Sequence, residues 1–448
     1  MRQVPSKKDD PASQRHSVSR RDFLKRLTAA GGAGLAAPAF VASSTLGLGD
    51  AVAASDRITL GSIGLGHRGR YDLEHFVRKD DVQCVAVCDC FADRRARGKK
   101  LVDGIQGNTD CVAHRFHEKI LERDDIDAVL IATGDRWHGV LSALAARAGK
   151  DIYSEKPFCM TIGEGRDLVE VTKRFGTIWQ CGTQRRSNAS FRSAVNLVRS
   201  GAIGRLHTIT CYLGSAWNRN GIAKPEPAPD PENFFYDRWL GQAPWAPYSP
   251  VRVNLWRMNW DTGGGVIPDM GAHYFDIAQW AHDSEMSGPV EYEGTAEWQD
   301  DGFQNVPIHV DVRARYEDGV EIHMMNYGRG PGQSKKGMRF EGDEGEVLID
   351  DFGNITTKPE SLIREAVAGF GYGHMSDHIR DFLDSTKTRQ LTASNPELAQ
   401  RAHTICHCAN LCLRLGRKLR WNAEAERFVN DPEANRMLRT AMRQPWRV

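Results

Sequence analysis

Two residues in the second half of the chain have types and a spacing that suit acid–base chemistry. Asp269 and His273 lie four residues apart, shortly after three consecutive glycines at 263–265 that let the backbone pass close to a ligand. If the chain from residue 269 to residue 280 is helical, the two side chains share one face. An unperturbed histidine titrates near neutral pH, so His273 suits proton transfer. The spacing alone leaves open that the pair only caps and braces a helix.

A glycine-rich turn early in the chain carries a second chemical signal. The sequence GLGHRG at 64–69 follows an apolar stretch at 57–63 and precedes a helical pattern at 70–79. A second apolar stretch at 82–88 ends on Asp89, at the distance from the turn where a ribose-binding acid is expected. A strand, this turn, a helix and such an acid together predict the binding of a nicotinamide dinucleotide.

Each position of the turn has a physical role in that prediction. Gly64 permits the tight turn, Gly66 leaves room for the pyrophosphate, and Gly69 lets the helix pack closely on the sheet. The start of the helix offers free N–H groups and a partial positive charge to phosphates. His67 and Arg68 lie at this helix start and complete the predicted cofactor contacts.

The acid that follows the second strand indicates which dinucleotide binds. Asp89 is expected to accept hydrogen bonds from the adenosine ribose hydroxyls, which favours NAD. Arg94 and Arg95 are close enough in the sequence to keep NADP open as an alternative.

The pattern of the first half predicts the elements that must position these residues. Further buried strands are expected at 127–133 and 151–154, with a helix at 139–149 between them. Alternating strands and helices indicate a parallel sheet, whose ligands lie beyond the carboxyl ends of its strands. Thr133, His138 and Lys156 fall at or just after such ends.

Composition limits the remaining possibilities. The chain has 448 residues and a net charge of +1, which suggests two or three domains and gives no reason to expect a nucleic-acid partner. Its ten cysteines include no CxxC pair. We therefore expect buried free thiols and no metal site.

The N-terminus has the features of an export signal. Ser19-Arg20-Arg21 begins a basic region, a soft apolar stretch runs from 27 to 48, and small residues follow at 51–53. This order predicts a secretory signal over 1–54, and the paired arginines resemble the twin-arginine signal. A periplasmic or otherwise exported protein is expected, with no membrane span after the signal. A disordered basic tail is the alternative.

Several motifs together resemble the glucose-fructose oxidoreductase / inositol dehydrogenase family, called Gfo/Idh/MocA. They are the glycine turn, the strand end at 132–133 with His138, Glu155-Lys156-Pro157, and the stretch 263–276. The signal and the elements at 184–187 and 239–245 resemble an exported branch of that family. The resemblance implies an α/β fold: a Rossmann domain at 55–180, then an α/β domain with a large open, mostly antiparallel sheet at 181–420. Residues 421–448 would form a C-terminal extension. Strand alternation at 308–316 and a hairpin at 337–349 fit that sheet.

The resemblance also implies roles for individual residues. Lys156, Asp269 and His273 would surround the reacting alcohol, with Lys156 polarising its oxygen or sharing its proton. Asp269 would orient the imidazole or hold a substrate hydroxyl. Further contacts are implied: Thr133, His138, Glu155 and also Lys156 with the cofactor, and Gln184 and Arg185 with the substrate.

These expectations combine into a leading function and two alternatives. The leading prediction is NAD(P)-dependent hydride transfer to or from a hydroxyl-bearing carbon of a sugar, polyol or sugar derivative, by a homodimer or homotetramer. The first alternative is glycoside cleavage through transient oxidation by a tightly bound, recycled NAD. The second is a non-catalytic sugar-binding protein on the same fold, against which the presence of Lys156, Asp269 and His273 together argues.

Overall fold

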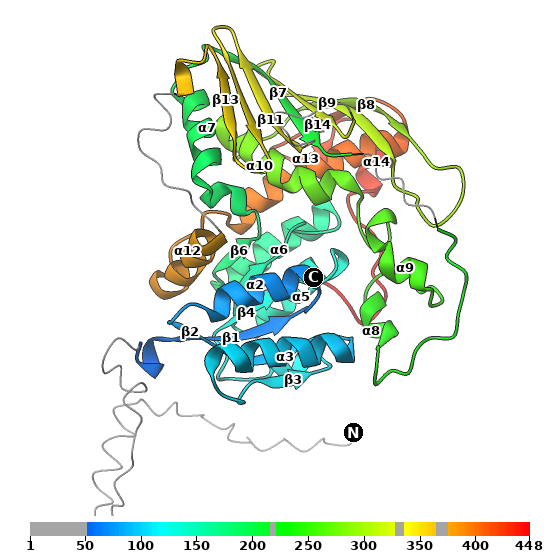
Figure 1. Cartoon of the computed structure of the whole chain (residues 1–448). Coiled ribbons are helices and arrows are strands. Elements are labelled where there is room, and N and C mark those ends of the chain that lie inside the picture. Colours follow the sequence, from blue (N-terminus) through cyan, green and yellow to red (C-terminus); the bar gives the residue numbers. More distant parts are fainter. Residues whose placement is uncertain (1–51, 216–220, 328–335, 364–374) are drawn as a thin grey trace, which may run out of the picture. The chain divides into compact units, whose positions relative to one another are not determined.

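The first half of the chain forms a six-stranded parallel sheet with the strand order β3-β2-β1-β4-β5-β6. The computed structural model describes residues 52–215, 221–327, 336–363 and 375–448, of which 55–448 form one unit (Figure 1). Residues 1–51 of the expected export signal lie outside the described residues. The bounds of this half are η2 (Ala54–Asp56), β1 (Ile58–Ile63), α2 (His67–Val77), β2 (Val82–Cys88), α3 (Ala92–Gln106), β3 (Val112–His114), α4 (Glu118–Leu121), β4 (Ala128–Ile131), α5 (Arg136–Arg147), β5 (Asp151–Ser154), α6 (Ile162–Phe175) and β6 (Trp179–Cys181).

Helices cover both faces of this sheet, as a parallel sheet requires. One face packs on α2 and α3, and the other on α4, α5 and α6. The strand order matches a dinucleotide-binding Rossmann fold, and the predicted strands and first helix are confirmed to within a few residues.

Two segments from the second half of the chain also pack on the first sheet. Helix α12 (Met375–Thr388) places Ile379, Phe382 and Leu383 in the same apolar cluster as α2 and the strands. The end of the chain packs partly buried Met442 and Trp446 against the cluster on the opposite face.

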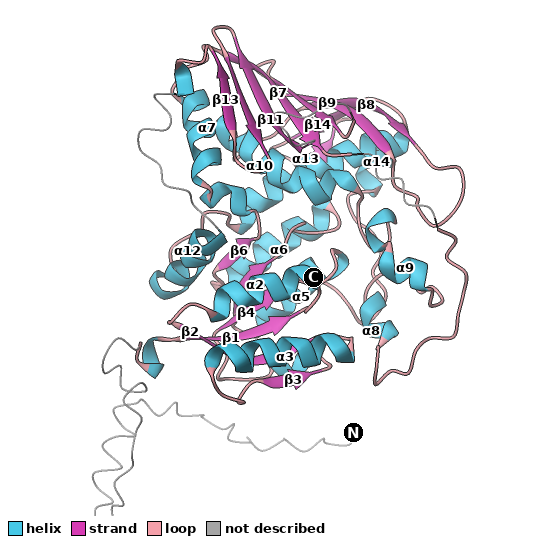
Figure 2. Ribbon diagram, in the orientation of Figure 1, coloured by secondary structure: helices cyan, strands magenta, loops and turns pink. Residues whose placement is uncertain are grey.

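The second half forms a nine-stranded sheet with the order β13-β12-β11-β7-β10-β9-β8-β14-β15 (Figure 2). Among the described strands of this second sheet, only β10 and β7 pair in parallel, so the predicted mostly antiparallel sheet is confirmed. The strands are β7 (Leu206–Leu213), β8 (Glu291–Glu297), β9 (His309–Arg315), β10 (Glu321–Met325), β11 (Lys336–Gly342), β12 (Glu346–Asp350), β13 (Ile355–Lys358), β14 (Leu419–Asn422) and β15 (Arg427–Phe428).

The side-chain alternation in this sheet follows the predicted pattern. Val310, Val312 and Ala314 of β9 are buried, whereas Arg313 and Arg315 are exposed. The buried side chains pack on helices of the second half, and these helices cover one face of the sheet (Figure 1). The helical elements are η3 (Gln184–Ser187), α7 (Ala189–Arg199), α8 (Tyr236–Leu240), α9 (Pro250–Asn254), η4 (Trp256–Met258), η5 (Ile267–Gly271), α10 (Ala272–Ala281), α13 (Pro396–Leu415) and α14 (Pro432–Arg436).

The helix expected over 269–280 begins differently from the prediction. Its first turn, η5, is a wider π-helical turn, and regular α-helix starts only at Ala272. Pro268 lies in this turn, where its missing N–H is tolerated. Single π-turns are frequent at functional sites, and this one carries Asp269.

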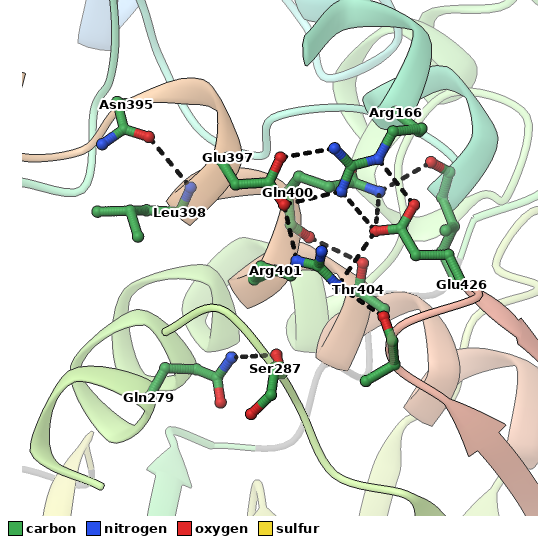
Figure 3. Close-up of polar contacts among 12 residues, drawn as sticks. Arg166, Gln279, Ser287, Asn395, Glu397, Leu398, Gln400, Arg401, Thr404 and Glu426 are labelled. Carbon is green, nitrogen blue, oxygen red and sulfur yellow. Dashed lines mark hydrogen bonds and ion pairs between the residues drawn. The ribbon is translucent and has the colours of Figure 1, made fainter. Parts of the chain in front are cut away.

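An ion-pair cluster joins the two halves. The guanidinium of Arg166, on α6, forms paired hydrogen bonds of 2.6 and 2.9 Å with Glu397 at the start of α13. It forms another pair, of 2.8 and 2.7 Å, with Glu426 between β14 and β15 (Figure 3). Paired contacts of this kind fix orientation as well as distance.

Within the described parts of the chain, the helices are too short or too polar to cross a lipid bilayer.

Candidate active site

The glycine turn has the geometry that close packing and a bound phosphate group both require. Gly64 has a φ of 95°, and a Cβ there would lie 2.5 Å from the carbonyl oxygen of Ala132. A Cβ on Gly69 would lie 2.1 Å from the carbonyl oxygen of Gly64. Both positions therefore need glycine for the backbone to fold this way.

Gly66 differs from its two neighbours in the turn. The nearest atom to a Cβ on Gly66 would be a guanidinium nitrogen of Arg94, 3.8 Å away, so the space beside it is open. That space belongs to a cavity, and Gly66 immediately precedes the first residue of α2. A phosphate group in this space would meet the unpaired N–H groups of a helix start, so the turn fits a dinucleotide.

Asp89 lies at the end of β2 and is buried. One of its carboxylate oxygens accepts a hydrogen bond of 2.7 Å from the N–H of Leu65, and the other accepts one of 2.9 Å from the N–H of Phe91. The carboxylate thus holds the glycine turn in place while it lines the cavity. Its remaining lone pairs are available to ribose hydroxyls.

Arg94 and Arg95, which left NADP open as an alternative to NAD, occupy different positions. Arg94 lines the cavity beside Asp89, with its guanidinium stacked 3.9 Å from the ring centroid of Phe91. Arg95 instead donates to the carbonyl oxygens of Asp89 and Glu232. Of these two arginines, Arg94 is therefore the one placed beside Asp89 in the cavity, where a phosphate on the adenosine ribose would lie.

Both halves of the chain build the walls of this cavity, which has a volume of about 460 Å³. Arg238 and Trp239 of α8 and Trp256 of η4 line it together with the glycine turn. The strap that carries them, residues 230–257, is fixed to the first half near Asp89. Phe234 stacks on Phe91 with 3.9 Å between ring centroids, and backbone hydrogen bonds join 233–235 to 90–92.

A second, smaller cavity of about 230 Å³ adjoins the first. The two share Arg68, Ala132, Thr133 and Arg257 in their linings, so they meet at the carboxyl end of β4. The smaller cavity gathers most of the predicted site residues. Its lining is Arg68, Ala132, Thr133, Asp135, His138, Glu155, Lys156, Gln184, Arg257 and His273.

Lys156 and Asp269 form a direct ion pair at this cavity. The Lys156 Nζ donates to the Asp269 carboxylate at 2.8 Å and to its carbonyl oxygen at 2.6 Å. The Arg257 Nε lies 3.3 Å from the same carboxylate. Burial acts to raise the pKa of Asp269, but the charges of Lys156 and Arg257 outweigh it and lower that pKa. Asp269 is therefore ionised at neutral pH.

His273 lines the same cavity from α10 and is buried. Burial, together with the positive charges of Arg185 and Lys156, lowers the pKa of its imidazole well below the usual range. The near-neutral titration expected from the sequence is therefore wrong, because the sequence does not show how deeply the ring is buried. Among the described residues, no group is hydrogen-bonded to its Nδ1.

Arg68, Glu155 and Gln184 form a polar network on another side of the cavity. The Glu155 carboxylate accepts hydrogen bonds from Arg68 Nε at 3.0 Å and from Gln184 Nε2 at 2.9 Å. Arg68 also pairs at 3.0 Å with Asp72, a buried carboxylate one turn along α2. This network connects the start of α2 to the start of the second half.

His138 is fully enclosed, and its role is partly structural. Its Nδ1 lies 2.8 Å from the carbonyl oxygen of Pro157, and burial lowers the pKa of the ring to about 4. A neutral ring donates this hydrogen bond and leaves Nε2 unprotonated. His138 thus holds the backbone next to Lys156 while it lines the cavity.

The remaining residues singled out from the sequence occupy three different places in the structure. Arg185 is absent from the described cavity lining; its guanidinium pairs with Asp351 and stacks on Tyr274. Asp276 pairs at 2.7 Å with Arg186. His67 is exposed at the rim of the cofactor cavity.

Two charged residues of the smaller cavity were missed from the sequence. Asp135 is 3 % exposed and comes a few residues after β4, so its place at the carboxyl end of a parallel strand was the available signal. Arg257 lies in η4, and nothing in its sequence context connects it to Lys156 or Asp269.

The cysteines match the expectation of free thiols. All ten are unpaired, and each is buried except Cys90, which is partly exposed. No cluster of metal-binding side chains occurs among the residues in the described ranges.

Comparison with known proteins assigns the chain to a family. Residues 58–183 match the NAD-binding Rossmann fold of the oxidoreductase family Gfo/Idh/MocA, and residues 187–448 match the C-terminal alpha/beta domain of that family. The fold and the site thus define a two-domain, NAD-binding oxidoreductase. The chain belongs to the Gfo/Idh/MocA oxidoreductase family.

Individual relatives are more distant. The chain is 26 % identical over 227 residues to the myo-inositol 2-dehydrogenase of Thermotoga maritima, an alignment covering 51 % of this chain and 55 % of that protein. It is 30 % identical over 212 residues to a glycosyl hydrolase family 109 protein of Solibacter usitatus, covering 45 % of this chain and 46 % of the relative. The chain therefore spans about half the length of the curated relatives it matches.

A solved structure shows the same fold. The WlbA dehydrogenase of Chromobacterium violaceum, in complex with NADH and UDP-GlcNAcA, has a TM-score of 0.62 to this chain at 16 % identity. The superposition covers 82 % of this chain and 96 % of that one.

Proposed function

We propose that this protein transfers a hydride between a nicotinamide cofactor and a hydroxyl-bearing carbon of a sugar, a polyol or a sugar derivative. The observation that carries the proposal is the junction of two cavities at the end of β4. One cavity holds the glycine turn and Asp89, and the other holds Lys156 and His273. The similarity to a myo-inositol 2-dehydrogenase supports a polyhydroxylated substrate.

The cofactor, when bound, supplies the hydride acceptor, and the residues of the chain handle the substrate oxygen. A lysine ammonium has three N–H donors, of which Lys156 directs two to Asp269. The third donates to the substrate oxygen and stabilises negative charge that develops there. Asp269, held ionised, keeps Lys156 in this orientation. His273, kept neutral by its surroundings, contacts the hydroxyl without adding charge.

A screen of alcohols with the purified protein tests this function. We expect NADH to form from NAD⁺ with at least one member of a panel of myo-inositol, other polyols, common aldoses and sugar acids. An increase in NADH absorbance that depends on both compounds supports the proposal. No NADH with any member, in a protein that binds NAD⁺, would count against it.

A second candidate function is glycoside cleavage through transient oxidation by an NAD that stays bound. Two observations favour it: the similarity to a glycosyl hydrolase family 109 protein and the strap of residues 230–257 that walls the cofactor cavity. The same panel separates the two functions when aryl glycosides are included. Release of the aryl alcohol without net NADH formation would indicate cleavage, and net NADH without cleavage would indicate the dehydrogenase.

We further propose that the protein is exported by the twin-arginine route. The support is the sequence at 19–53 alone, with Arg20 and Arg21 as its central feature. Expressed in a bacterium with this route, the full chain should appear in the periplasm. Changing both arginines to lysine should retain it in the cytoplasm, and an unchanged periplasmic fraction would refute the proposal.

The oligomeric state is likewise a proposal, a homodimer or homotetramer. Its support is the nine-stranded sheet, whose helices pack on one face while the other carries side chains such as Arg313 and Arg315. Sedimentation equilibrium of the folded protein distinguishes monomer, dimer and tetramer.

A further inference from the structure

Arg257 places a guanidinium beside the ion pair of Lys156 and Asp269. The Nζ of Lys156 and the Nε of Arg257 lie 2.8 and 3.3 Å from one and the same oxygen, Oδ1 of Asp269. The two cations are therefore direct neighbours. The Arg257 side chain lines both cavities and is 44 % exposed, so a ligand at their junction can reach it.

A glycine-rich loop fixes the backbone of Arg257. Its carbonyl oxygen accepts a hydrogen bond of 3.1 Å from the N–H of Gly265. The Thr262 hydroxyl donates one of 2.6 Å to the carbonyl oxygen of Trp256. A Cβ on Gly263 would lie 2.8 Å from the Cα of Arg257, so this close approach needs glycine. The guanidinium also lies 4.1 Å from the ring centroid of Trp256, which helps to hold it in place.

The other two cations of the smaller cavity are already committed through hydrogen bonds. The Lys156 Nζ directs two of them to Asp269, and the Arg68 Nε donates one to Glu155. Within the part of the chain that the structure describes, the Arg257 guanidinium donates no such bond, and Asp269 is the one carboxylate within 4 Å of it. Its terminal N–H groups are therefore available to a ligand.

The charges around Arg257 favour a negatively charged ligand. Lys156 and Arg257 bring two positive charges to one carboxylate, that of Asp269, whose pKa is lowered. Asp135 is a further carboxylate of this cavity lining, but burial raises its pKa to about 7. At neutral pH it therefore offsets the remaining positive charge only in part. An anionic group of the substrate would complete the neutralisation.

We propose that Arg257 binds a carboxylate of the substrate, so that the protein prefers sugar acids to neutral sugars and polyols. This inference rests on the proposed hydride transfer and names its substrate class. A planar guanidinium with free N–H groups matches the two oxygens of a carboxylate through paired hydrogen bonds. Because the guanidinium adjoins the Lys156 ammonium, the carboxylate lies close to the carbon whose hydroxyl is oxidised. The carboxylate itself does not react.

Compounds that differ only in this charge test the inference. We compare D-gluconate with D-gluconamide, and D-glucuronate and D-galacturonate with their amides, as substrates for NADH formation. For at least one acid, the wild-type kcat/KM should exceed that of the amide about tenfold or more, as expected for a hydrogen-bonded charge pair. In Arg257→Gln this ratio should fall to about threefold or less, mainly through a higher KM for the acid.

Two further variants frame the result. Arg257→Lys keeps the positive charge but not the paired donors, so its ratio should lie between those of wild type and Arg257→Gln. Arg174→Gln is the matched control, because it removes an exposed arginine of α6 that also lies over an aromatic ring, that of Phe175. It should retain the wild-type ratio. Calorimetric titration with NAD⁺ verifies that each variant is folded.

The outcomes separate this inference from the proposed function. If Arg257→Gln slows acid and amide equally, the guanidinium only orients Asp269, and the inference is wrong. A loss of NAD⁺ affinity with an unchanged ratio assigns the guanidinium to the cofactor and also overturns it. A wild type that oxidises neutral compounds but none of the acids overturns the inference and leaves the proposed function intact. One that binds NAD⁺ and oxidises no alcohol overturns both.

Discussion

Gly69 and Gly66 of the glycine turn differ in the space beside their Cα atoms. Adding one methyl group to each should therefore have different consequences. Gly69→Ala should lower the free energy of unfolding by about 1–3 kcal/mol, because its Cβ would lie 2.1 Å from the Gly64 carbonyl oxygen. Gly66→Ala should leave stability nearly unchanged, because its nearest neighbour would be 3.8 Å away. It should instead weaken NAD⁺ binding tenfold or more, since the methyl group occupies the cofactor cavity.

Urea unfolding and calorimetric NAD⁺ titration of both variants check this prediction, each variant serving as the control for the other. Equal losses of stability, or full NAD⁺ affinity in Gly66→Ala, would contradict it.

At the scale of single residues, the sequence predicted which residues form the site better than it predicted their protonation states. The glycine turn, Asp89, Lys156, Asp269 and His273 all lie in or beside the two cavities, as their spacing and the family resemblance led us to expect. Protonation states were not predictable, because they depend on burial and on charges brought in from other elements. Arg257 was missed for the same reason, whereas Asp135 did have a signal in the sequence, its place just after the carboxyl end of β4.

At the scale of elements, α12 shows how a distant segment completes the first half. Its Arg380 donates hydrogen bonds of 2.9 and 2.8 Å to Asp81, which precedes β2, and Lys387 donates one of 2.5 Å. Burial acts to raise the pKa of Asp81, but these hydrogen bonds outweigh it and lower that pKa to about 2.

A pH-dependent loss of stability follows from this contact. A carboxylate whose pKa is lower in the folded state stabilises the fold above its unfolded pKa, and this contribution is lost as the pH falls through the folded pKa. Asp81→Asn should therefore lower the free energy of unfolding by about 1 kcal/mol at pH 7, after allowance for solvent screening. The difference from wild type should shrink between about pH 4 and pH 2.

Urea unfolding at pH 7 and pH 3 measures that trend. Asp384→Asn is a matched control, because it removes an exposed partner of the same Arg380. A deficit for Asp81→Asn that does not shrink at low pH would show that charge is not its cause.

The sequence predicted where strands occur, but not which distant elements pack on them. Periodicity located the strands of the first sheet and the buried face of β9, because burial on one or both faces leaves a clear pattern. The packing of α12 on the first sheet depends on contacts about 300 residues apart, which no local pattern records. Residues 269–271 were predicted as α-helix but belong to the π-helical turn, because one extra residue in the hydrogen-bonded turn leaves little trace in a local pattern.

At the scale of the whole molecule, the cofactor cavity depends on both halves of the chain. The glycine turn and Asp89 of the first half line it, and so do Trp239 and Trp256 of the second half. A ligand that binds such a cavity stabilises both halves together, because it binds only when both are folded and in place.

NAD⁺ should therefore raise the thermal unfolding temperature of both halves in one step. At a concentration of 100 Kd the expected stabilisation is about 2.7 kcal/mol. Differential scanning calorimetry with and without NAD⁺ measures it, and Gly66→Ala should show a much smaller shift at the same concentration. Two separate transitions, of which NAD⁺ moves only one, would disagree with a cavity shared by both halves.

The central claim is that the chain oxidises an alcohol with NAD⁺ at the cavity that holds Lys156. The most direct measurement compares NADH formation by wild type, Lys156→Ala and the surface control Lys173→Ala with the panel compound that the wild type oxidises. We predict a loss of at least about 10²-fold in Lys156→Ala, unchanged NAD⁺ affinity and full activity in Lys173→Ala. Turnover by Lys156→Ala near the wild-type rate would contradict the claim.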